Sequence, residues 1–493
     1  MKQNKFSSMQ LSKFFVFIFS AMLIMSCADL DQDFANERYH TASHASAISA
    51  AGGTQGLKAL DGAILAYLRD GEAVTDEFGL KAVDLGMDLR GNDMDMSRNT
   101  WFGAYNNYQN IILTSNDNDF MWEFFYKVIN NANGIINTVP DTAPADVLVF
   151  KYKSYTYRAI AYFYLLRIYQ HTRAADTELA IPIDFGDFVG QPKSTVAQVK
   201  QQILTDLTTA YNGLQSYTRA SKEEVDASVV AAYLARYYLT YENWTEAEKY
   251  ADIAMKVGSI SSDVQHGFDE LSLSEAIWGS VVTAATSEVY QSFFSHTSQI
   301  NDGYSGWNHF KTVNSNLYDA IPTTDKRRAW FADQQYGPWT VLVPGTWGHY
   351  NITPKYTSLK FIAQPGPGQF IGDYIYLRNT EFYLTKAEAL ARQGKDAEAR
   401  QVLFDLNSVR DASYTLSTNS GQALIDEILL YRRIELWGDG VSSFDLARTG
   451  TAVNRKDGRQ NLLMPGADLL IQPLDAQLIY QIPQREVDAN PNF

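Results

Sequence analysis

The chain has 493 residues, of which 45% are hydrophobic and 20% are charged, and its formal net charge is −15. This balance excludes a disordered, collagen-like or coiled-coil protein, and the length is ample for a large core or for several lobes. The negative charge argues against nucleic acid as a partner, because phosphate binding requires clustered lysine and arginine. The single cysteine excludes an intramolecular disulfide and a cysteine-based zinc site.

The first 26 residues have the pattern of a lipoprotein signal peptide. Three lysines without an acid precede an apolar run from Phe14 to Met25, which is too short to cross a bilayer but is typical of an export signal. The run ends in Ile24-Met25-Ser26-Cys27, which resembles a bacterial lipobox, although Met25 is bulkier than the usual residue. We predict lipidation at Cys27 and an acidic, polar tether at 27–48. The alternative is an ordinary secretory signal.

Helical periodicity dominates the rest of the chain. Residues 120–139 are predicted to form a helix that stops at Pro140, and residues 151–171 an aromatic helix that is buried on most faces. Two further segments, 235–254 and 387–406, place small or apolar residues at matching offsets. This pattern resembles tetratricopeptide helix pairs, in which small residues let antiparallel helices approach closely. One pair cannot bury its face alone, so we expect the first two helices to stack with these pairs.

Residues 286–375 differ from the helical regions on either side. They are rich in Gly, Pro, Asn, Ser and aromatic residues, and residues 91–108 share this character. Long loops inside a regular domain are usually functional or disordered, and the density of Trp and Tyr favours an ordered segment. We therefore predict an N-terminal helical region at 49–285, a loop-rich aromatic lobe at 286–375 and a C-terminal helical region at 376–493.

Several blocks of the C-terminal region occur in the order found in one known family. They are Arg378 to Arg392 as R-x-x-E-x-Y-L-x-x-A-E-A, Leu406 to Arg410 as L-N-x-V-R, Tyr431 to Gly440 with Asp445 to Arg448, and the closing Ile482-Pro483 and Asn490-Pro491-Asn492-Phe493. Together they resemble the SusD/RagB family of Bacteroidetes outer-membrane lipoproteins. Tyr431 and Asp439 depart from this pattern, because each replaces a usual glutamate.

The resemblance implies a mainly α, SusD-like fold in which tetratricopeptide-type helix pairs pack against a loop-rich, aromatic ligand-binding lobe. It further implies a lipid-anchored, surface-exposed protein of the cell outer membrane, without a cofactor. Such proteins capture a nutrient, usually an oligosaccharide, and pass it to a SusC-like TonB-dependent transporter. The helical side would contact this partner, and the aromatic lobe would hold the glycan.

The candidate ligand contacts are aromatic residues in polar, glycine-containing loops. The apolar face of a sugar ring stacks on Trp or Tyr, while its hydroxyl groups bond to Asn, Asp, Gln and Arg. Asp93 and Asp95 are weak calcium candidates, since Asp-x-Asp is common in loops. Trp122, Trp244, Trp278, Trp330 and Trp437 fall in helix-like or family-core blocks and are predicted to be structural. The ligand candidates are Trp101, Tyr304, Trp307, Trp339, Trp347 and Tyr350.

No catalytic residue is assigned, because the sequence lacks G-x-S-x-G, H-E-x-x-H and Walker A patterns. The 7 histidines are scattered, and His296, His309 and His349 share only a region. Non-catalytic glycan binding is the main hypothesis. Three alternatives stay open: a peptide-binding member of the family, a surface glycoside hydrolase whose two carboxylates meet only in the fold, and a scaffold for the transporter complex.

Overall fold

The computed structural model describes residues 53–72, 75–186, 190–287, 289–300, 303–342, 348–349, 351–363, 370–456 and 469–493. The predicted signal peptide, Cys27, the predicted tether, and the candidates Trp347 and Tyr350 lie outside the described residues.

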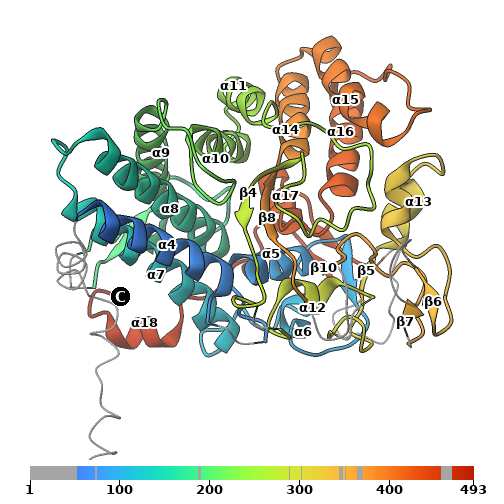
Figure 1. The fold of residues 1–493 in the computed structure, drawn as a ribbon, viewed down its shortest axis with the longest axis horizontal. Helices are drawn as coiled ribbons and strands as arrows, with labels where there is room; N and C mark the ends of the chain where they lie inside the picture. Colours follow the sequence, from blue (N-terminus) through green and yellow to red (C-terminus); the bar gives the residue numbers. More distant parts are fainter. Residues whose placement is uncertain are drawn as a thin grey trace, which may run out of the picture.

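The fold is mainly helical, as the sequence predicts, and its long helices pack side by side in one stack (Figure 1). Each helix contacts the next through its apolar face, in the order α4 and α7, then α8, α9, α10, α11, α14, α15 and α16. These helices are α4 (Thr54–Asp70), α7 (Asn116–Thr138), α8 (Ala145–Tyr169), α9 (Val196–Gly213), α10 (Ala227–Thr240), α11 (Trp244–Ala254), α14 (Asn379–Arg392), α15 (Asp396–Arg410) and α16 (Gly421–Glu435).

The two predicted helix pairs are confirmed as α10 with α11 and α14 with α15. Their small residues are buried at the helix contacts, as Ala235, Ala251 and Ala387 illustrate. Helix α11 packs directly on α14, so the two pairs are neighbours in space although the loop-rich segment separates them in the sequence. Helices α7 and α8 join the same stack through α9, as the sequence analysis expected.

Local caps explain where several helices begin. Helix α8 starts at Ala145, six residues before the predicted start. Pro144 at its N-cap suits a helix start, because proline has no backbone N–H group that would lack a hydrogen-bond partner there. Helix α9 was not predicted, yet its start carries a capping box in which Thr195 and Gln198 bond to each other's backbone. Asp226 and Asn243 cap α10 and α11 through their side-chain oxygens, which accept backbone N–H groups of the first turn.

Short antiparallel ladders attach the loop-rich segment to the helices. Strand β4 (Ala276–Ser280) precedes the segment and pairs with β8 (Tyr374–Arg378), which ends it, so the chain returns to the point where it left the stack. Within the segment, β5 (Lys311–Val313) pairs with β1 (Met94–Met96). The other pairs are β2 (Leu179–Pro182) with β3 (Lys193–Thr195), β6 (Thr340–Val341) with β7 (Gly348–His349), and β9 (Val453–Asn454) with β10 (Leu470–Ile471).

The loop-rich segment shares the main apolar core with the helices. Phe293, Phe331 and Trp330 from this segment belong to the same buried cluster as Trp122 and Trp278. Trp437 is also buried and Trp244 is partly buried, so the tryptophans predicted as structural are packed inside. The remaining helices are α5 (Leu80–Leu89), α6 (Gly103–Asn106), α12 (Phe293–Thr297), α13 (Ser315–Ala320), α17 (Ser442–Thr449), α18 (Gln484–Ala489), and the 3-10 turns η1 (Lys326–Trp330) and η2 (Ala476–Leu478).

A buried charge network, centred on Glu435 at the end of α16, joins these elements. The Glu435 carboxylate accepts hydrogen bonds from Arg327, Arg378 and Arg410, with N···O distances of 3.1, 2.9 and 2.8 Å. Glu275 binds Arg378 at 3.1 Å and Arg410 at 2.7 Å. Because each guanidinium group has carboxylate partners, the network can be buried without an uncompensated charge.

Two further carboxylates balance the network. Asp325 binds Arg327 at 2.6 Å, and Asp439 binds Arg378 at 2.5 Å and Lys360 at 3.1 Å. Although burial alone would raise the pKa of Glu435, the guanidinium groups of Arg410, Arg378 and Arg327 hold that pKa well below its usual value. Glu435 is therefore ionised in the folded protein.

Arg378 and Glu381 are spaced i, i+3, as in a local helical ion pair, but they bind other partners. Arg378 is the N-cap of α14 and has an extended backbone, so its side chain is directed to Glu435 and Asp439 instead. Glu381 binds Arg236 of α10 at 2.7 Å. The pair fails because the i, i+3 geometry requires both residues inside the helix.

We expect Glu435→Ala to lower the free energy of unfolding by about 3–5 kcal/mol, because it leaves buried guanidinium groups uncompensated. Chemical denaturation followed by circular dichroism measures the change. The control is Glu246→Ala, which removes the exposed pair between Glu246 and Lys249 and should cost at most about 1 kcal/mol. Equal losses in the two variants would contradict a central role for Glu435.

Candidate functional site

Two of the predicted ligand candidates, Trp101 and Tyr304, lie against each other. Their ring centroids are 3.9 Å apart and their planes are inclined at 45°. Trp101 precedes α6, and Tyr304 lies between α12 and β5, so the two are distant in the sequence. The β1–β5 ladder brings them together, because it pairs Met96 with Lys311.

Three further rings surround this pair, and we call the five residues the aromatic cluster. The ring of His309 lies 5.0 Å from Trp101, and the ring of His296 lies 4.8 Å from Tyr304. Tyr290, whose ring is 5.9 Å from Tyr304, is 45% exposed. His296 is buried, whereas Trp101 and Tyr304 are partly exposed. One side of the cluster is therefore packed in the protein interior, and the other side is accessible to solvent.

Hydrogen bonds hold the two loops of the cluster in place. The Ser97 hydroxyl donates to the carbonyl oxygen of Asn308 at 2.6 Å and accepts the Phe310 N–H at 2.8 Å. The Thr100 hydroxyl lies 2.7 Å from Nδ1 of His309. The positions of Trp101 and His309 are therefore set before any ligand arrives, which lowers the ordering cost of binding.

The histidines of the cluster are uncharged at neutral pH. Burial lowers the pKa of His309 to about 4, and the positive charges of Lys311 and Arg98 act in the same direction. Burial, together with the charge of Lys311, lowers the pKa of His296 well below its usual value. Both imidazoles therefore pack as neutral aromatic rings beneath Trp101 and Tyr304.

The other described candidates lie on more exposed backbone. Trp307 follows Tyr304 in the same turn, where its N–H donates to the carbonyl oxygen of Gly303, and its side chain is 57% exposed. Trp339 belongs to the turn before β6 and is 71% exposed. In Figure 1 the β6–β7 hairpin lies at the right edge, whereas α6 and α12, which flank the aromatic cluster, lie at the lower centre.

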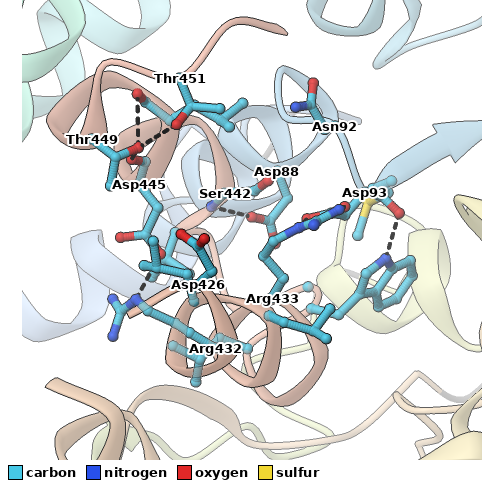
Figure 2. A pocket seen from close by; sticks show the side chains of 18 residues that line it. Asp88, Asn92, Asp93, Asp426, Arg432, Arg433, Ser442, Asp445, Thr449 and Thr451 are labelled. Atoms are coloured by element: carbon cyan, nitrogen blue, oxygen red, sulfur yellow. Dashed lines mark hydrogen bonds and ion pairs between the residues drawn. The ribbon is translucent and has the colours of Figure 1, made fainter. Parts of the chain in front are cut away.

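Asp93, one of the two weak calcium candidates, makes structural contacts. Its buried carboxylate accepts hydrogen bonds from Arg433, the shortest at 2.5 Å, and its carbonyl oxygen accepts the Trp437 indole N–H at 2.8 Å (Figure 2). Asp95 lies on β1 and accepts the Met96 N–H at 2.8 Å. Across the described ranges, no group of three or more His, Cys, Asp or Glu side chains is suited to hold a metal ion.

Asp93 also lines a pocket of about 250 Å³ between α5, α16 and α17. Its walls are mainly apolar. Arg432 binds Asp445 there at 2.6 Å, and Asp88 accepts the N–H groups of Gly440 and Ser442 (Figure 2). Burial raises the pKa of Asp88 to about 7. The pocket offers no exposed aromatic face, so the aromatic cluster is the better candidate for sugar binding.

The roles of Tyr290, His296 and His309 are not predicted from the sequence, where the two histidines belong only to a scattered set. Their contacts depend on the β1–β5 register and on the return of the loop between α12 and β5, and neither feature has a local sequence signature.

Two family models match the chain. The model described as "Starch-binding associating with outer membrane" matches residues 78–239, and the model of the SusD family matches residues 353–493. A SusD-like protein, P38, from Formosa agariphila is 24% identical over 388 residues, which cover 70% of this chain and 75% of that protein.

Solved structures share the fold. A SusD-like carbohydrate binding protein from Bacteroides vulgatus matches with a TM-score of 0.77 and 24% identity, covering 89% of this chain and 97% of that one. Surface glycan-binding protein A from Bacteroides thetaiotaomicron, solved with laminarihexaose, matches with a TM-score of 0.66 and 16% identity, covering 88% and 97%.

We expect His309 to titrate with a midpoint near pH 4, and the pKa of His296 to lie well below its usual value, because both rings are desolvated beside Lys311. NMR of the imidazole carbons, assigned with His309→Asn, measures both midpoints. In the denatured chain each histidine should titrate near about 6.5. A native midpoint of His309 at or above that value would contradict the described environment.

Proposed function

The chain belongs to the SusD family, and from this premise we propose that it binds a glycan through the aromatic cluster, without cleaving it. The observation that carries the proposal is the packing of Trp101 against Tyr304 at a partly exposed edge, on loops that are already ordered. A sugar ring can stack there on its apolar face while hydroxyl groups reach the polar loop atoms. The complex of a similarly folded protein with laminarihexaose supports this class of ligand.

The charges that act on His309 are not those that hydrolysis requires. A glycoside hydrolase requires two carboxyl groups about 5–10 Å apart across the scissile bond. The charges that act on the His309 ring are those of Lys311 and Arg98, which are both positive. The hydrolase alternative therefore gains no support from the charged groups next to His309.

We expect Trp101→Ala to weaken oligosaccharide binding by about 10-fold or more, because a central aromatic contact commonly contributes more than about 1–2 kcal/mol. Calorimetry on the mature chain carrying Cys27→Ser, titrated with plant, host and microbial oligosaccharides and with peptides, measures this loss. Tyr304→Ala should have a similar effect.

The matched control is Trp339→Ala, which removes an exposed tryptophan from the β6–β7 hairpin and should change the affinity less than about twofold. Loss of binding in Trp339→Ala, with binding retained in Trp101→Ala, would move the site to that hairpin. Binding heat with peptides but not with oligosaccharides would favour the peptide-binding alternative. Release of shorter sugars would favour the hydrolase.

We further propose that the captured glycan passes to a SusC-like TonB-dependent transporter, with the helical stack as the contact surface. Proteins of this family associate with the outer membrane, and the match of residues 78–239 to an outer-membrane-associated family model supports the same location. Among the described helices, none is both long enough and apolar enough to cross a bilayer. A lipid on Cys27 would supply the attachment.

Lipid anchoring is tested by Cys27→Ser. We expect the wild-type protein in the outer-membrane fraction and labelled by a fatty-acid analogue, and the variant unlabelled and released into the soluble fraction. Met25→Ala keeps the cysteine and should retain both the label and the membrane location. Membrane association of an unlabelled Cys27→Ser variant would contradict lipidation as the anchor.

A further inference from the structure

A buried cation that has no carboxylate partner among the described residues lies beneath the aromatic cluster. Lys311 on β5 is 1% exposed, and its Nζ donates to the carbonyl oxygen of His309 at 3.3 Å. The same nitrogen lies 5.8 Å from the ring centroid of Phe102. Neither contact neutralises the charge.

The other buried lysines of the described residues are all paired. Lys81 lies 3.9 Å from Asp84, and Lys151 lies 2.6 Å from Asp141. Lys153 binds Glu224 at 2.9 Å, and Lys360 binds Asp439 at 3.1 Å. Lys311 is therefore the exception among the buried lysines of the described ranges.

An uncompensated buried charge destabilises a fold, and such groups concentrate where a protein uses them. Burial lowers the pKa of Lys311 to about 7. In the β1–β5 ladder, Lys311 faces Met96, whereas the neighbouring pair of Asp95 and Thr312 faces the opposite side, since successive side chains of a strand alternate. The acidic residue closest in the ladder therefore points away from Lys311.

A second cation, Arg98, lies in the loop that carries Trp101. Arg98 is exposed, it precedes Trp101 in this loop, and no ion pair joins it to the rest of the described chain. Its charge and that of Lys311 both act on the His309 ring, which packs against Trp101. The two charges that act on His309 are thus both positive, although the chain carries a formal net charge of −15.

We propose that the aromatic cluster binds an anionic glycan, one that bears carboxylate or sulfate groups, and that Lys311 and Arg98 supply the attraction for its charge. This inference rests on the proposed glycan-binding function and names the class of its ligand. The sugar ring stacks on Trp101 and Tyr304, and the anionic substituent faces Arg98 at the rim. Lys311 acts from below through a medium of low dielectric, where its field is screened less than that of a surface charge.

The test compares glycans that differ only in charge. The probes are oligogalacturonate and its methyl ester, a sulfated galactan oligosaccharide and its desulfated form, and a neutral laminari-oligosaccharide. We expect the charged member of at least one pair to bind about 10-fold tighter than its uncharged counterpart, and to weaken as salt is raised, because salt screens charge. The pair that responds identifies carboxylate or sulfate.

The outcomes separate this inference from the proposed function. Equal or tighter binding of the uncharged probes, still lost in Trp101→Ala, overturns the anionic class and leaves glycan binding at the cluster in place. Failure of every probe, charged and uncharged, to bind overturns both proposals.

Variants assign the charge to its residues. Lys311→Met keeps the length of the side chain and removes a buried charge, so the variant should fold, which thermal unfolding checks. It should weaken binding of the charged probe about 10-fold and leave that of the uncharged probe within about twofold. Arg98→Ala should weaken binding of the charged probe and leave binding of the uncharged probe unchanged. Lys355→Ala, which removes an exposed lysine elsewhere in the loop-rich segment, should leave both unchanged.

The pH dependence of binding tests the role of Lys311. Lys311 acts on His309 beside β5 and on His296 on α12, and Arg98 after β1 also acts on His309. Burial lowers the pKa of both histidines, and arginine stays charged, so none of these groups contributes to a change between pH 6 and 8. Asp76 and Glu77 follow Thr75, whose carbonyl oxygen contacts His296. Burial raises the pKa of Asp76 to about 6 and that of Glu77 to about 7, so both titrate in the same range as Lys311. The affinity for the charged probe should therefore fall as the pH rises through about 7, and Lys311→Met should remove the part of this dependence that comes from Lys311. A wild-type affinity that does not vary with pH would overturn the role of Lys311.

Discussion

The architecture depends on the buried ion pairs of Glu435. This one carboxylate binds Arg327 in the middle of the loop-rich segment, Arg378 at its end and Arg410 on α15. Glu275, just before the segment begins, binds the last two. The beginning, middle and end of a long irregular stretch are therefore tied to the same point of the helical stack. Because these charges are buried and mutually compensated, moving any one segment would leave an unpaired charge in the core.

The candidate site is a consequence of this attachment. Once the loop-rich segment is tied to the helices, β5 can pair with β1, and that register places Tyr304 and His309 against Trp101. The Glu435 network and the aromatic cluster differ in whether their buried cations have carboxylate partners. Around Glu435 the cations are matched by carboxylates, whereas Lys311 beneath the aromatic cluster has no such partner among the described residues. This contrast distinguishes a structural use of buried charge from one directed toward a ligand.

Membership of the SusD family does not by itself identify a ligand, because one fold can carry many sites. Two candidate sites on this chain differ in character. The pocket between α5, α16 and α17 has mainly apolar walls, and Asp93 serves there as the partner of Arg433. The aromatic cluster combines accessible rings, ordered loops and unmatched positive charge. The partly exposed rings of the cluster support a glycan ligand, and the positive charges beside His309 support an anionic glycan.

The sequence by itself determined the helix pairs, the order of the family motifs and the aromatic loops that contain Trp101 and Tyr304. These features depend on periodicity, caps and local composition, which act over a few residues. Only the tertiary structure decided that Arg378 pairs with Glu435 and not with Glu381, that Asp93 binds Arg433, and that His296 and His309 complete the cluster. These partners lie far apart in the chain, so their contacts are set by strand register and helix packing. The isolation of Lys311 follows for the same reason, since burial and the lack of a nearby carboxylate are properties of the assembled fold.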